Sequence, residues 1–133
     1  MEGLRVTSTL SPELETLVRN TIGACLEVHR TLGPGLLEGV YPRAIACELE
    51  ARHIPFELER AIPIRYRNRI LCHHRLDLLV DQQLILEIKS VDRLASIHVA
   101  QIISYLRVTG VRVGLLVNFN VPILRQGIRR VVL

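Results

Sequence analysis

The chain has 133 residues, of which 49% are hydrophobic and 23% charged, a composition typical of a globular protein with its own core. It excludes collagen-like, low-complexity and disordered chains, and the length predicts a single domain over residues 1–133. The formal net charge of +4 permits a polyanionic partner without requiring one. Among the 17 basic residues, Lys89 is the only lysine.

The cysteines and the uncharged segments predict a cytoplasmic protein with no membrane association. Cys25, Cys47 and Cys72 are odd in number and lack CxxC spacing, so a reducing compartment is expected. The longest uncharged segment, Leu94–Leu106, is shorter than the ~20 apolar residues that span a bilayer. The N-terminus also lacks the apolar core of a signal peptide.

Two helices are predicted before the first strand. Ser11-Pro12-Glu13 is typical of a helix start, and apolar residues at three- and four-residue spacing predict a helix over 12–31. A Gly-Pro-Gly turn follows it. Because Pro42 is tolerated only in a first turn, the second helix should begin within Leu37–Tyr41, which places Glu38 at its N-terminus.

Beyond residue 55 the hydrophobic period changes to two, which indicates strands. The predicted strands cover 56–66, 70–80, 84–90 and 111–117, with a short edge strand over 128–133. The turns between the first three strands are predicted at 67–69 and 81–83. A helix over 95–109, ended by Gly110, separates the third strand from the fourth. The chain is therefore expected to be α/β, with the order α-α-β-β-β-α-β.

The second hairpin predicts two carboxylates on one sheet face. If residues 81–83 form its turn, the pairs on the first face are Leu76 with Ile88, Leu78 with Leu86, and Val80 with Leu84. The pairs on the second face are Leu79 with Ile85, Asp77 with Glu87, and Arg75 with Lys89. A slip of one residue would spoil the wholly apolar first face, so this register is preferred.

Asp77 and Glu87 in this register have their Cβ atoms ~5 Å apart, where like charges destabilise one another. Two carboxylates and a backbone carbonyl suit a hard divalent ion such as Mg²⁺. Lys89 projects from the same face, and its compact ammonium suits a metal-bound water better than the arginine fork. The alternative is a salt-bridged sheet face, in which Asp77 pairs with Lys89 or Arg75 and Glu87 pairs with another arginine.

Several segments resemble a known family. The run LGPGLLEGVY, with Gly35, Glu38 and Tyr41, resembles the signature of the GxxExxY protein family, which belongs to the PD-(D/E)XK nuclease-like superfamily. Asp77 followed by Glu87-Ile88-Lys89 resembles the D…ExK core of that superfamily. Further similar segments are Gln101 with Tyr105, which resembles a QxxxY element, and the runs 107–110 and 117–122. The resemblance covers about residues 12–133.

The resemblance implies an αβββαβ core over 33–133, with a mixed sheet flanked by helices and an extra N-terminal helix over 12–31. It implies that Asp77, Glu87 and the carbonyl of Ile88 bind Mg²⁺ or Mn²⁺. Lys89 would orient or deprotonate the attacking water. Glu38 would be an extra ligand or a water-positioning base. Pro42, directly after the signature tyrosine, is a departure that could change where Glu38 points.

The resemblance also implies that Gln101 and Tyr105 face the substrate or brace Lys89. By periodicity alone, these two residues lie on a solvated face of their helix. Arg75, in the basic first hairpin, is a candidate for binding phosphate.

The function expected from these observations is metal-dependent hydrolysis of phosphodiester bonds in nucleic acid, with DNA as the first substrate. A catalytically silent nucleic-acid-binding or accessory protein on the same scaffold is the first alternative. An interaction module whose carboxylate pair serves only structure is the second. The sequence leaves open DNA against RNA, and monomer against homodimer.

Overall fold

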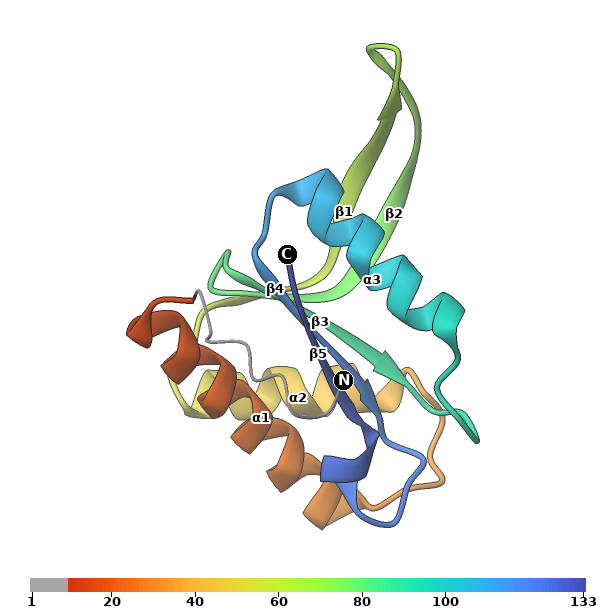
Figure 1. The fold of residues 1–133 in the computed structure, drawn as a ribbon. Coiled ribbons are helices and arrows are strands. Elements are labelled where there is room, and N and C mark those ends of the chain that lie inside the picture. Colours follow the sequence, from red (N-terminus) through yellow and green to blue (C-terminus); the bar gives the residue numbers. More distant parts are fainter. Residues whose placement is uncertain (1–9) are drawn as a thin grey trace, which may run out of the picture.

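The computed structural model describes residues 10–133, and its elements follow the predicted order (Figure 1). The helices are α1 (Pro12–Leu32), α2 (Val40–Ala51) and α3 (Ser96–Thr109), with a 3₁₀ helix η1 (Leu124–Gly127). The strands are β1 (Phe56–Tyr66), β2 (Arg69–Val80), β3 (Leu84–Lys89), β4 (Val113–Asn118) and β5 (Ile128–Val132). The predicted α/β class, with an αβββαβ core and an extra N-terminal helix, is confirmed.

The five strands form one mixed sheet in the order β1-β2-β3-β4-β5. β3 and β4 are parallel and are joined through α3, whereas the other neighbours are antiparallel. A parallel pair needs such a crossover, because a hairpin turn joins only antiparallel strands. The predicted turn at 81–83 is confirmed, since Val80 pairs with Leu84 and Leu78 with Leu86.

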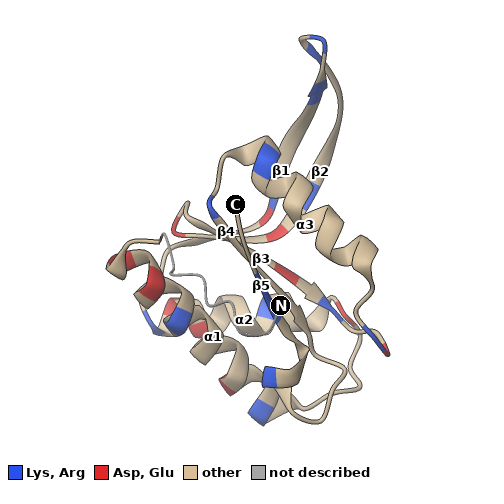
Figure 2. Ribbon diagram, viewed as in Figure 1, with Lys and Arg blue, Asp and Glu red and all other residues tan. Residues whose placement is uncertain are grey.

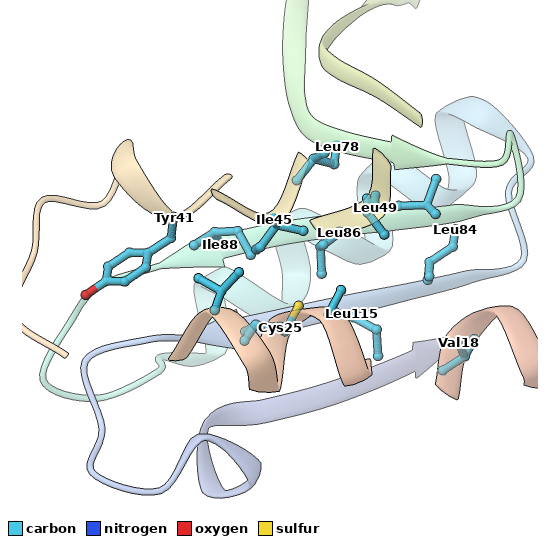
Figure 3. Packing of buried hydrophobic residues seen from close by; sticks show 14 of the residues in the cluster. Val18, Cys25, Tyr41, Ile45, Leu49, Leu78, Leu84, Leu86, Ile88 and Leu115 are labelled. Carbon is cyan, nitrogen blue, oxygen red and sulfur yellow. The ribbon is translucent and has the colours of Figure 1, made fainter. Parts of the chain in front are cut away.

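The helices cover both faces of the sheet. α1 and α2 bury the larger core, where Ile45 and Cys25 meet sheet residues such as Leu86 and Leu115 (Figure 3). α3 covers the other face, with Ile102 packed in a cluster with Ile85. Each fully buried large side chain contributes roughly 1.5–3 kcal/mol relative to exposure. No helix within residues 10–133 is long and apolar enough to cross a membrane.

The first hairpin extends beyond the rest of the sheet (Figure 1). Tyr66 pairs with Arg69, so its turn has two residues rather than the three predicted. Both, Arg67 with φ 50° and Asn68 with φ 64°, adopt the positive φ that tight hairpin turns require. We call residues 60–76 the hairpin arm.

Candidate active site

The backbone ladder between β2 and β3 ends at the pair Leu78 and Leu86. Beyond it, the N–H of Asp77 donates to Oε2 of Glu87 at 2.8 Å, and the N–H of Ile88 donates to Oδ2 of Asp77 at 2.7 Å. Each carboxylate therefore binds the backbone of the opposite strand. We call this pair of bonds the Asp77–Glu87 clasp. It replaces the backbone pairs predicted for Asp77 with Glu87, and for the residues that flank them.

The predicted apolar face is interrupted at Asp77. Alternation predicts Leu76 beside Leu78 and opposite Ile88, but Leu76 packs in the cluster beneath α3, whereas the other two pack beneath α1 and α2. On β1, Glu59 has φ 57° and has no ladder pair with Asp77. Because a left-handed residue cannot continue a pleated strand, the faces exchange here. The predicted pairing of Leu76 with Ile88 is therefore wrong.

The two carboxylates sit in an environment that disfavours their charges. Glu87 is only 5% exposed. Burial first, and the charge of Asp77 second, raise the pKa of Glu87 to about 8. Burial also raises the pKa of Asp77, although the hydrogen bond from Ile88 opposes that shift. Like charges this close favour either protonation or a bound cation.

Lys89 is partly buried on β3, two residues beyond Glu87. Its charge lowers the pKa of both Asp77 and Glu87, although burial outweighs it. Within residues 10–133, no salt bridge joins Lys89 to either carboxylate, and Arg75 instead pairs with Glu59 at 2.8 Å. These contacts contradict the alternative of a salt-bridged sheet face.

Glu38 lies just ahead of α2, which begins within the range that Pro42 predicted. Its Oε1 accepts a hydrogen bond from the N–H of Ser90 at 3.0 Å, directly after Lys89 in the chain. The charge of Glu38 raises the pKa of both clasp carboxylates. The structure therefore places Glu38 beside the clasp, although it lies far from Asp77 and Glu87 in sequence.

Tyr41 holds the loop that carries Glu38. Its buried ring stacks on Phe119 with ring centroids 4.4 Å apart. Its hydroxyl donates to the carbonyl of Gly33 at 2.8 Å and accepts from the N–H of Leu36 at 3.1 Å. One side chain thus fixes both ends of the turn that leads to Glu38.

α3 presents Tyr105 and Gln101 differently. Tyr105 is 6% exposed, so its assignment to a solvated face is wrong. Burial, and then the charges of Glu87 and Asp77, raise the pKa of the Tyr105 phenol, and the ring meets His74 edge to face at 5.8 Å. Gln101 is exposed and makes no side-chain hydrogen bond to another residue in the described range.

Sequence reasoning missed two residues at this site. Asn118 is buried at the end of β4, where it accepts from the N–H of Val91 at 3.1 Å and donates to the carbonyl of Val91 at 2.8 Å. It thus ties the segment after Lys89 to β4. The sequence feature that could have identified Asn118 is its place as a polar residue directly after a predicted apolar strand. Glu59 carried no signal, because its left-handed φ depends on the faces of the sheet around it.

A cavity of about 270 Å³ opens beside Asp77, and the charged side chains among its other lining residues are Arg43, Glu59 and Arg75. Within residues 10–133, no three His, Cys, Asp or Glu side chains cluster closely enough to form a ready metal site. The donor chemistry nevertheless fits a divalent ion. The clasp uses one oxygen of Asp77 and one of Glu87, which leaves Oδ1 and Oε1 as hard ligands.

Comparison with protein families matched residues 15–131 to the family described as the PD-(D/E)XK nuclease superfamily. The matched region contains every residue of the candidate site. Comparisons with curated proteins and with solved structures found no match.

Proposed function

The chain belongs to the PD-(D/E)XK nuclease superfamily, and from this premise we propose that it is a Mg²⁺- or Mn²⁺-dependent nuclease that hydrolyses phosphodiester bonds in DNA. We further assign it to the GxxExxY family within that superfamily. The observation that carries the proposal is a buried Glu87 and a half-buried Asp77 whose carboxylates lie beside Lys89. Within residues 10–133, Lys89 makes no salt bridge.

Asp77 and Glu87, with the carbonyl of Ile88, are the residues proposed to hold the metal. A bound divalent ion lowers the pKa of a water ligand and offsets charge that builds on the phosphate. The raised pKa values support this assignment, because a cation would stabilise two carboxylates whose ionised forms burial disfavours.

Lys89 is proposed to orient the attacking water and to balance negative charge at the phosphate. Glu38 is proposed to position that water, or to add a further ligand, from the opposite side of the site. In the reaction the water oxygen bonds to phosphorus while a P–O ester bond breaks, which gives a phosphate monoester and an alcohol. Tyr105 is proposed to brace the carboxylates, while Gln101 and Arg75 contact the substrate.

Cleavage of labelled DNA and RNA panels in Mg²⁺, Mn²⁺ or EDTA tests the proposal. Lys89→Ala, purified in parallel, controls for contaminating nuclease, and Arg19→Ala on α1 controls for the loss of a surface cation. We expect metal-dependent DNA cleavage that Lys89→Ala abolishes and Arg19→Ala preserves. Equal cleavage by all three proteins, or none by any of them, would reject it.

One observation favours the silent binding protein as a second candidate. Asp77 and Glu87 already accept backbone hydrogen bonds, so the clasp could hold β2 and β3 together without metal. That function predicts DNA binding that is unchanged by EDTA, and no cleavage under any condition.

A further inference from the structure

The hairpin arm is the most exposed regular element of the described chain. Every residue from 65 to 75 is exposed, although all but two of them belong to paired strands. Figure 1 shows β1 and β2 continuing together past α3 to a tip that no other element covers. The inner end of the arm contributes Ile62 and Leu76 to the core beneath α3, whereas the outer part, residues 65–75, has a surface available for a partner.

The charge on the arm has one sign. Its basic residues are Arg60, Arg65, Arg67, Arg69 and Arg75, and no acidic residue lies between Glu59 and Asp77. The two arginines at the base have carboxylate partners, Glu57 and Glu59. Within residues 10–133, the three nearest the tip have none. Figure 2 shows only basic residues coloured at the tip.

Apolar side chains accompany these arginines. Tyr66 is 63% exposed, Leu71 62% and Ile70 49%, and the Arg67 guanidinium lies 5.8 Å from the centre of the Tyr66 ring. A surface that only keeps a protein soluble does not need exposed apolar residues among its charges. Guanidinium groups beside apolar groups fit a ligand with phosphates and with sugar or base edges.

The dimensions of the arm match duplex DNA. Tyr66 lies six residue steps beyond Arg60 along β1, which corresponds to about 20 Å of strand. The B-DNA major groove, about 12 Å wide, admits a two-stranded β-ribbon. The deep, narrow major groove of A-form RNA does not. At about 3.4 Å per base pair, the arm spans roughly six base pairs.

We propose that the hairpin arm lies in the major groove of duplex DNA, where Arg65, Arg67 and Arg69 hold the backbone about six base pairs from the position of Asp77 and Glu87. The inference deepens the proposed function, since it names double-stranded DNA as the substrate. Only the part of this inference that concerns where the DNA is cut rests on the proposed nuclease function. The binding of DNA by the arm stands separately.

The test replaces Arg65, Arg67 and Arg69 with glutamine in the full chain carrying Asp77→Asn, so that DNA is bound but not cut. Binding of a labelled 24-base-pair duplex is measured by fluorescence anisotropy in EDTA at several salt concentrations. We expect affinity to fall at least ~10-fold near 0.1 M salt, and the slope of log K against log salt to shrink by about 2 to 3.

The matched control replaces three arginines elsewhere with glutamine: Arg19 on α1, Arg125 on η1 and Arg129 on β5. It removes the same charge, and we expect a loss below ~3-fold with duplex DNA. Equal losses in the two triple variants would overturn the proposal, because net charge alone would then explain binding. An arm variant that binds DNA unchanged, or that loses only binding to anionic phospholipid vesicles, would also overturn it.

Two further experiments separate this inference from the nuclease proposal. Double-stranded RNA should bind the arm variant and its parent alike. In the cleaving protein, the arm substitutions should slow cutting of a long duplex but not of one that ends within four base pairs of the cut. Arm-dependent binding without any cleavage would reject the nuclease alone, whereas cleavage unaffected by the arm at every length would reject the arm alone.

Discussion

The backbone N–H of Asp77 donates to Oε2 of Glu87 at 2.8 Å, just past the last ladder pair of β2 and β3. This bond favours the ionised form of Glu87, yet burial and the charge of Asp77 outweigh it and the pKa rises to about 8. The clasp is therefore sensitive to protons and to cations, and substitutions can separate its structural and chemical roles.

The stability of the metal-free protein should fall as pH rises from about 4.5 to about 8. In that range the folded state keeps a proton on Glu87 that the unfolded chain, in which this carboxyl has its ordinary pKa of 4.5, has lost. The contribution is complete below pH 4.5 and is lost as pH passes through about 8. We expect a decrease of a few kcal/mol in the free energy of unfolding, measured with urea in EDTA. If the free energy of unfolding of Glu87→Gln changed with pH as steeply as that of the parent protein, the attribution to Glu87 would be wrong.

Asp77→Asn should fold and should lose its response to metal. The asparagine side-chain oxygen still accepts from the N–H of Ile88, but the charge that raises the pKa of Glu87 is gone. Millimolar Mg²⁺ should raise the melting temperature of the parent protein and leave that of Asp77→Asn unchanged, because ligands stabilise only the state that binds them. An equal Mg²⁺-dependent rise in melting temperature in both proteins would show that the ion binds elsewhere.

Lys89→Arg should be nearly as inactive as Lys89→Ala, with kcat reduced at least ~100-fold. Arginine keeps the charge, but its larger fork and firmly held proton do not reproduce a compact ammonium. Single-turnover cleavage and the Mg²⁺-dependent melting shift are measured together. Lost cleavage with a retained shift supports a role in the chemistry, whereas an active Lys89→Arg shows that charge alone suffices.

Tyr41→Phe should cost roughly 1–3 kcal/mol in unfolding free energy, because it removes two partly buried hydrogen bonds, one to the carbonyl of Gly33 and one from the N–H of Leu36, each worth about 0.5–1.5 kcal/mol. The stacked ring remains, so the fold should persist while the loop bearing Glu38 loosens and kcat falls. Tyr66→Phe is the control for stability, since Tyr66 is 63% exposed and should change it by less than ~0.5 kcal/mol. Equal stability of the two variants would show that the Tyr41 hydroxyl does not hold the loop that carries Glu38.

Glu59→Gly should be more stable than Glu59→Val by about 1–2 kcal/mol. Both substitutions remove the exposed pair with Arg75, so the comparison isolates the φ of 57°. Glycine adopts this conformation freely, whereas β-branched valine does not. Urea unfolding of the two variants measures the difference, and equal values would show that the strand relaxes at no cost.

Local physics determined most of the helices and strands in advance. The helix start at Ser11, the limit set by Pro42 and the change to a period of two are read over a few residues, and the elements follow them. The hairpin register was equally accessible, because a slip at the pair Leu78 and Leu86 would turn apolar side chains to the wrong face. That register holds only as far as this pair, because beyond it the clasp replaces the predicted pairs of Asp77 with Glu87 and of Arg75 with Lys89.

Only the tertiary structure decided how the site is built. Three features of the site depend on packing between segments: the clasp, the exchange of faces at Glu59, and the hydrogen bonds of the Tyr41 hydroxyl. Their energies arise only when the layers pack. The burial of Tyr105 depends in the same way on how α3 docks on the sheet. A periodic pattern records which face is apolar. It does not record where a left-handed residue reverses the faces, or where a carboxylate replaces a ladder bond, since both depend on contacts far away in the chain.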